Sequence, residues 1–168
     1  MRLRHWHEDD LEVFFDIYSR WEVMRWLGPQ PRRALRDREE ARARMARWHE
    51  RERGLPDPFG LWAIVPDADA DIATGLDRPV GTVLLLPLHD ANGPTDEVEV
   101  GWHLHPDHQG RGYATRAARL LLDRMPPGVL ALTDPDNHAS QAVARRLGMR
   151  DEGLTDRWFG LTARQFRA

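Results

Sequence analysis

The feature that most restricts the fold of this chain is a strand that runs into a glycine-rich turn and then into a helix. Residues 97–105 alternate between polar and apolar side chains, which is typical of a strand whose two faces meet different surroundings. One face carries Glu97, Glu99, Gly101 and His103, and the other carries Val98, Val100, Trp102 and Leu104. The turn at residues 109–115 opens a stripe of apolar residues at helical spacing. This order predicts a helix N-terminus at the end of a sheet strand.

The glycine turn is suited to binding an anion through main-chain groups. The first N–H groups of a helix have no intrahelical partner and carry the positive end of its dipole. Glycines let the backbone approach a phosphate closely, and Arg111 adds a cation at the rim. The dinucleotide fingerprint does not fit, because its third glycine is absent, and a phosphate loop would need a lysine, which the chain lacks. A turn with a purely structural role is the alternative.

The rest of the pattern predicts a mixed sheet with helices on its faces. Strands are expected at residues 3–6, 59–65, 80–86, 97–105 and 129–133, with weak signals near 158–159 and 165–166. Helices are expected near residues 8–18, 21–27, 35–53, 114–125 and 139–147. Strands that pair first as hairpins and are later joined through helices indicate the α/β (α+β) class. No linker or repeat divides the chain, so we expect a single domain over residues 1–168.

Composition excludes several kinds of chemistry. The 168 residues contain no cysteine, which rules out disulfides, thiolate zinc sites and a cysteine that carries an acyl group. The net charge of -3 gives no general attraction to nucleic acid or to an anionic membrane. The first residues lack the apolar core of a signal peptide, and no stretch of about 18 apolar residues exists. We therefore expect a cytoplasmic protein with no membrane or nucleic-acid partner; a homodimer is left open.

Two motifs resemble a known enzyme superfamily. Gln109-x-x-Gly112-x-Ala114 is similar to the CoA pyrophosphate motif of the GNAT acetyltransferases. Asn137-His-Ala-Ser140, followed by Leu147-Gly148-Met149, resembles the pattern of their RimJ/RimL-like branch, as do residues 23–28 and 97–103. The resemblance spans roughly residues 1–155. It implies a GNAT-like, mostly antiparallel sheet that is splayed at a CoA cleft and flanked by helices.

The resemblance also implies roles for individual residues, with acetyl-CoA as the cosubstrate. Pantetheine is expected to pair with the main chain of Trp102, His103 and Leu104. The pyrophosphate is expected on the turn, formed by Gln109, Gly110, Arg111, Gly112, Tyr113, Ala114 and Thr115. Asn137 would bind pantetheine, and Ser140 would lie near the sulfur.

One position departs from the pattern of many superfamily members. They carry a tyrosine seven residues after the asparagine as the acid for the leaving thiolate, and here that position is Ala144. Ser140 is the natural substitute, although a thiolate with a pKa of about 8.5 leaves without much help.

Direct transfer to an amine also needs a base or a relaying water, because free amines are mostly protonated at neutral pH. Glu99 is the first candidate for the base and Glu97 the second. The alternative for each is a half-exposed carboxylate on a sheet. A backbone N–H near Trp102 or His103 is a candidate to stabilise the oxyanion of the tetrahedral intermediate.

Other charged clusters favour simpler interpretations. His103, His105 and His108 lack an acidic third ligand, and the run from Asp67 through Asp69 and Asp71 lacks the glycine and glutamate of a calcium loop, so no metal is expected. Residues 32–53 hold nine arginines against five acids. A solvated helix face is favoured there over docking to RNA.

The amine acceptor is the least determined partner. The acceptor site is expected from residues 21–27, the charged helix and the C-terminal hairpin; Trp21, Met24 and Trp26 either line it or belong to the core. A peptide or protein N-terminus is the leading acceptor on the resemblance. The alternatives are a small amine, such as an antibiotic, amino sugar or polyamine, and a non-catalytic module that only binds acyl-CoA.

Overall fold

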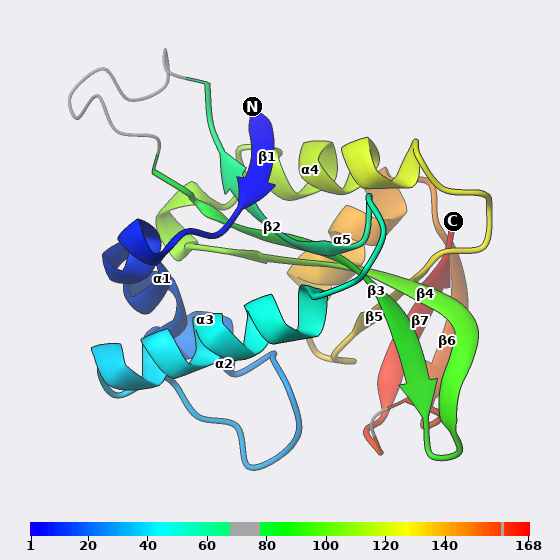
Figure 1. The fold of residues 1–168 in the computed structure, drawn as a ribbon. Coiled ribbons are helices and arrows are strands. Elements are labelled where there is room, and N and C mark those ends of the chain that lie inside the picture. Colours follow the sequence, from blue (N-terminus) through cyan, green and yellow to red (C-terminus); the bar gives the residue numbers. More distant parts are fainter. Residues whose placement is uncertain (68–77, 159) are drawn as a thin grey trace.

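The computed structural model describes residues 1–67, 78–158 and 160–168 (Figure 1). Its helices are η1 (Glu8–Asp10), α1 (Leu11–Tyr18), α2 (Trp21–Met24), α3 (Arg38–Glu52), η3 (Pro106–His108), α4 (Tyr113–Leu122) and α5 (His138–Arg146). Its strands are β1 (Arg2–His5), β2 (Gly60–Val65), β3 (Gly81–Asp90), β4 (Gly93–Leu104), β5 (Leu130–Thr133), β6 (Arg150–Thr155) and β7 (Ala163–Arg167). No described helix is long and apolar enough to cross a bilayer.

The described strands form one sheet in the order β1-β2-β3-β4-β5-β7-β6. Neighbouring strands are antiparallel except β4 and β5, which are parallel and paired at a single position, Glu99 with Leu130. Beyond Glu99, β4 continues to Leu104 along β3, without β5 at its other edge. The mixed, mostly antiparallel sheet with helices on its faces is thus confirmed, and it opens between β4 and β5.

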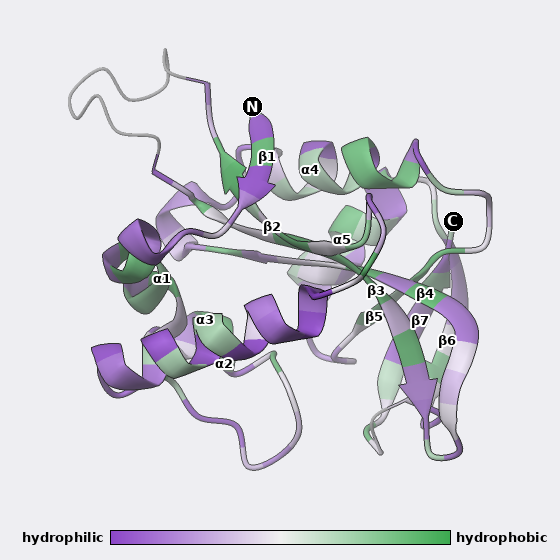
Figure 2. Cartoon of the chain, viewed as in Figure 1, coloured by the Kyte–Doolittle hydropathy of each residue, from purple (hydrophilic) through white to green (hydrophobic). Residues whose placement is uncertain are grey.

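Both faces of the sheet are covered (Figure 1). Helices α4 and α5 bury one apolar cluster, in which Val100 of β4 packs with Ala117 and Leu121 of α4. Helices α1, α2 and α3 bury a second cluster on the other face, around Phe14 and Met45. The helix at residues 38–52 is hydrophilic along most of its length (Figure 2), so only a narrow stripe of it contributes to this core.

The two predicted faces of β4 are confirmed. Val98, Trp102 and Leu104 pack against the α4 cluster, as Val100 does. His103 points to the opposite side, where its ring lies near those of Tyr18 and Trp48. The face that carries Glu99 and His103 therefore lies under the helices of the N-terminal third.

The structure corrects the sequence interpretation at two places. β4 begins at Gly93 rather than near residue 97, because Asp90 pairs with Gly93 across a two-residue turn whose Asn92 N–H donates to the Asp90 carboxylate. Strand β6 was missed because half of its residues are charged and most are exposed, as an edge strand allows. The loop aspartates 69 and 71 and the strand signal at Phe159 lie outside the described residues.

Candidate functional site

The first component of the site is the open edge of β4. The N–H of His105 donates to the carbonyl of Val80 at 2.9 Å, so the main chain of every second residue, including His103, faces β3. The main-chain groups of Trp102 and Leu104 consequently face the side that β5 has left. The Gln109 side chain donates to the Leu104 carbonyl at 3.4 Å, which is consistent with this orientation. An extended ligand with amide groups fits this edge as an added strand, and Trp102 and Leu104 are better placed than His103 to pair with it.

The second component is the turn that follows. Gly110 and Gly112 have φ of +74° and +78°, a conformation that favours glycine. Gly112 is the N-cap of α4, and no side chain caps the helix there. A Cβ built at Gly110 or Gly112 would meet no heavy atom within 4 Å, so the turn is open to an approaching molecule. The uncapped helix start, with no acidic residue in its first turn, fits a pyrophosphate.

Side chains contribute little to this cradle. Tyr113 and Ala114 are buried in the α4 core, so only their N–H groups remain for a ligand. Arg111 is exposed at the rim. Arg116, one turn into the helix, stacks its guanidinium over the Tyr113 ring at 5.1 Å. Binding at this turn would therefore depend on backbone conformation more than on any one side chain.

The third component is the start of α5, across the opening from β4. Asn137 is its N-cap, and its side-chain oxygen accepts the N–H of Ser140 at 3.1 Å. The asparagine thus shapes the helix start, and its amide NH₂ remains able to donate to a ligand. Ser140 is half-buried, and its hydroxyl has no hydrogen-bond partner in the described part of the chain. Ala144 is fully buried in the core.

The two candidate bases differ in their surroundings. Burial raises the pKa of Glu99 to about 7, against a smaller opposite effect of the positive charge of Arg51. The Glu97 carboxylate is instead held by the Arg167 guanidinium through two contacts, at 3.0 Å and 3.2 Å. A carboxyl group that titrates near neutral pH is suited to accept a proton, whereas one held in an ion pair is not free to do so. The surroundings favour Glu99.

A buried polar network on the same face of β4 as Glu99 was not expected from the sequence. The Tyr18 hydroxyl lies 2.6 Å from the Thr82 hydroxyl and 3.2 Å from Nδ1 of His103. Burial, and to a lesser degree the charge of Arg44, lowers the pKa of His103 to about 3, so the ring is neutral. Because these residues are 64 and 85 positions apart from Tyr18, no sequence spacing could have revealed the network.

The three histidines considered as metal ligands do not converge. His103 belongs to the Tyr18 network, whereas Nδ1 of His105 accepts the N–H of Asp107 at 3.2 Å. In residues 1–67, 78–158 and 160–168, no group of three or more potential ligands could hold a metal ion.

The described part of the chain also has a pocket of about 310 Å³ between the segment at residues 24–35 and α3. Met24 is buried and lines it, while Trp21 is 52% exposed and lies outside its lining. Trp26 is half-buried, with the guanidinium of Arg25 stacked on it at 4.2 Å. Of the three residues considered for the acceptor site, only Met24 therefore lines this pocket.

Comparison with known proteins identifies the family. The family model described as an acetyltransferase (GNAT) domain matches residues 1–150. The chain therefore belongs to the GNAT acetyltransferase family, and this part of the sequence-based resemblance is confirmed.

Individual relatives are more distant. An uncharacterized N-acetyltransferase of Bacillus subtilis, YnaD, is 35% identical over 61 residues, which cover 33% of this chain and 36% of that protein. The chain thus spans little more than a third of this curated relative in the alignment.

Solved structures match over nearly the whole chain. A GNAT-family acetyltransferase from Bacillus anthracis superposes with a TM-score of 0.73 at 18% identity, covering 99% of this chain and 92% of the other. RimL, a ribosomal α-N-protein acetyltransferase in complex with coenzyme A, gives 0.72 at 17% identity, with the same coverages. A phosphinothricin acetyltransferase from Sinorhizobium meliloti, in complex with acetyl-CoA, gives 0.68 at 16% identity, covering 99% and 86%. At these identities the likeness concerns the fold.

Proposed function

We propose that the chain is an acetyl-CoA-dependent N-acetyltransferase that moves an acetyl group directly onto a primary amine. The observation that carries the proposal is the course of β4. One strand holds Glu99 where it separates from β5, then exposes the main chain of Trp102 and Leu104, and leads to the glycine turn at the start of α4. A thioester bound along this edge would have its pyrophosphate on the turn and its reactive end near Glu99.

The binding roles follow from the same geometry. The N–H groups at residues 110–115 hold the pyrophosphate, with Arg111 at the rim. The main chain of Trp102 and Leu104 pairs with the amides of pantetheine, and the Asn137 NH₂ group donates to them from α5. The absence of cysteine from the sequence supports transfer within a ternary complex, since there is no enzyme thiol to carry the acetyl group.

The chemical step then needs one proton acceptor and one proton donor. Glu99 removes a proton from the ammonium, through a water molecule, and the free amine attacks the thioester carbonyl. The Trp102 N–H stabilises the negative oxygen of the tetrahedral intermediate. When the C–S bond breaks, the positively charged nitrogen of the intermediate loses its second proton. The Ser140 hydroxyl, or a water molecule, takes up that proton as it gives its own proton to the leaving thiolate, so the products are a neutral amide and the CoA thiol.

The identity of the amine acceptor is less well determined than the type of reaction. The RimJ/RimL resemblance supports a peptide or protein N-terminus, and the likeness to RimL extends over the fold. The likeness to an enzyme named for phosphinothricin, a small molecule, supports the alternative of a small amine at a comparable TM-score. Both acceptors present a primary amine to the same carboxylate.

The test is release of free CoA from acetyl-CoA across a panel of N-terminal peptides and small amines, with calorimetric CoA binding measured in parallel. Turnover with any class of primary amine supports the proposal. Tight CoA binding without turnover on the whole panel would favour the non-catalytic module instead.

A further inference from the structure

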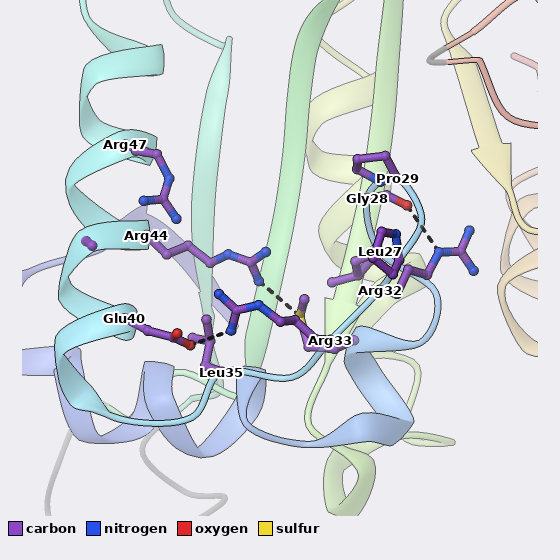
Figure 3. A pocket seen from close by; sticks show the side chains of 12 residues that line it. Leu27, Gly28, Pro29, Arg32, Arg33, Leu35, Glu40, Arg44 and Arg47 are labelled. Carbon is purple, nitrogen blue, oxygen red and sulfur yellow. Dashed lines mark hydrogen bonds and ion pairs between the residues drawn. The ribbon is translucent and has the colours of Figure 1, made fainter.

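The pocket of about 310 Å³ has a strongly cationic lining (Figure 3). Arg44 and Arg47 point into it from α3, and Arg33 reaches toward them from the segment at residues 24–35 (Figure 3). Arg32 of the same segment also lines the pocket, with its guanidinium directed away from the other three arginines (Figure 3). Its floor includes buried Met24 and Leu35. A volume near the lower end of the range for small-ligand sites accommodates one small molecule or the first residues of a peptide.

Two of these four guanidinium groups are neutralised within the protein. Arg32 pairs with Asp134 at 2.7 Å, and Arg33 pairs with Glu40 at 2.7 Å. Glu40 also accepts a hydrogen bond from Arg36, and these contacts lower its pKa to about 2. Its carboxylate is therefore ionised and already paired with two arginines. The single acid in the lining is therefore not available to balance a further arginine.

Arg44 and Arg47 have no carboxylate partner in the described part of the chain. Arg44 is half-buried, and among the described residues its guanidinium donates only to the Met24 sulfur. Burial, together with the charges of Arg47 and Arg33, lowers the pKa of Arg44. A half-buried guanidinium without a counterion is costly, and a ligand carboxylate or phosphonate would relieve that cost through two parallel hydrogen bonds.

Side-chain contacts connect the pocket to β4. Arg44 lies over the Tyr18 ring at 5.7 Å, and the Tyr18 hydroxyl contacts His103 on β4. Arg51 lies seven residues beyond Arg44 on α3, and its positive charge acts to lower the pKa of Glu99. Glu99 lies four residues before His103 on β4. Arg44, Arg47 and Arg51 recur at i, i+3 and i+7, so they form one ridge on α3, about 10 Å long, and the charge of its last member acts on Glu99.

We propose that this pocket binds an anionic group of the acceptor, so that the preferred substrate is a primary amine that also carries a carboxylate or phosphonate. The inference rests on the proposed acetyl transfer and specifies its substrate class. An anion held between Arg44 and Arg47 lies about one to two helical turns, roughly 6–10 Å along α3, from Arg51, whose charge acts on Glu99. The amine of the same molecule then points toward the Glu99 carboxylate.

Small molecules and peptides can both carry a primary amine together with an anionic group, and a matched pair of probes tests each kind of acceptor. For small molecules, 2-aminoethylphosphonate is compared with ethanolamine. For peptides, an N-terminus with aspartate at the second position is compared with the same peptide carrying asparagine. Affinities are measured by calorimetry in saturating CoA, so the result does not depend on turnover. We expect the anionic member of at least one pair to bind about tenfold more tightly or better, as for hydrogen bonds to charged groups.

The variants are Arg44→Gln and Arg47→Gln. Arg47 is exposed, so its replacement tests the pocket even if Arg44→Gln lowers the melting temperature. The matched control is Arg42→Gln on the same helix, since Arg42 is exposed and lies outside the pocket. Arg47→Gln is expected to reduce the preference for the anionic probe at least fivefold. Arg42→Gln is expected to leave this preference unchanged.

The inference would be overturned if the anionic probe bound less than fivefold more tightly than the neutral probe in both pairs. It would also be overturned if Arg42→Gln reduced this preference as much as Arg47→Gln does. An anion preference without acetyl transfer would support the pocket and contradict the proposed reaction. Transfer to neutral and anionic amines alike would contradict the pocket alone.

Discussion

The replacement Glu99→Gln is expected to change catalysis and stability in opposite directions. Glutamine keeps the size of the side chain but cannot take a proton. If Glu99 is the base, kcat should fall by about 10²- to 10⁴-fold, the range of general base catalysis. The wild-type rate should rise with pH through the pKa of about 7 and then level off, and this rise should be absent from the variant. Loss of a charge that only binds the ammonium would instead raise KM.

The stability effect follows from the same pKa. Below pH of about 4.5 the carboxyl group is protonated in both the folded and the unfolded chain. Between about 4.5 and 7 only the folded chain keeps the proton, so the free energy of unfolding decreases as pH rises. Above 7 the full cost of burying the charge is present, about 3 kcal/mol from the size of the shift. The glutamine side chain does not titrate, so the variant should gain up to this amount relative to wild type at pH 8, and little at pH 4.5.

Urea unfolding of both proteins at pH 4.5, 6 and 8, with acetyl-transfer rates where both are folded, measures the two effects. Glu97→Gln is the comparison, because the Arg167 ion pair already holds that carboxylate. It should lose some stability and keep the rise of rate with pH. A stability difference for Glu99→Gln that does not change with pH would show that Glu99 ionises normally, and an unchanged pH–rate profile would refute its role as base.

Three further replacements test other parts of the site. Gly112→Asp places a negative charge at the proposed pyrophosphate site at a conformational cost of about 1–2 kcal/mol; calorimetry should show CoA binding lost while circular dichroism stays native, and unchanged affinity would contradict the cradle. Ser140→Ala should lower kcat about tenfold or more, with little effect on KM, if the Ser140 hydroxyl donates the proton to the thiolate. A kcat equal to that of the wild type would leave Ser140 with a packing role only. Ala144→Tyr should cost about 1–3 kcal/mol in chemical denaturation, because Ala144 is fully buried, and should not raise kcat; faster turnover would indicate that position 144 reaches the thiolate.

Local physics explains which parts of the fold the sequence predicted. The alternation along β4 and the turn at Gly110 and Gly112 depend on neighbouring residues, and both appear in the structure where expected. Gly148, just after the C-cap of α5, likewise has the left-handed conformation that a glycine commonly takes behind a helix. Strand β6 had no such signal, because an edge strand with charged residues on it reads as a loop.

The site itself was only partly predictable, because its chemistry depends on distant partners. Nothing near Glu97 in the sequence shows that Arg167, 70 residues later, would hold its carboxylate and make Glu99 the stronger candidate for the base. The arginines of α3 read as a solvated face, since a helical spacing does not reveal which surface it meets. Only the packing of residues 24–35 against α3 brings Arg44 and Arg47 to a pocket.

A single-turnover experiment with acetyl-CoA labelled in the acetyl group tests the central claim most directly. The enzyme is mixed with the labelled thioester, with and without an accepted amine, and the label is followed in protein, amine and CoA fractions. Direct transfer predicts that the label moves to the amine only when both substrates are present and never resides on the protein. Label on the protein without amine, or label that stays on CoA although the thioester is bound and the amine is present, would contradict the account.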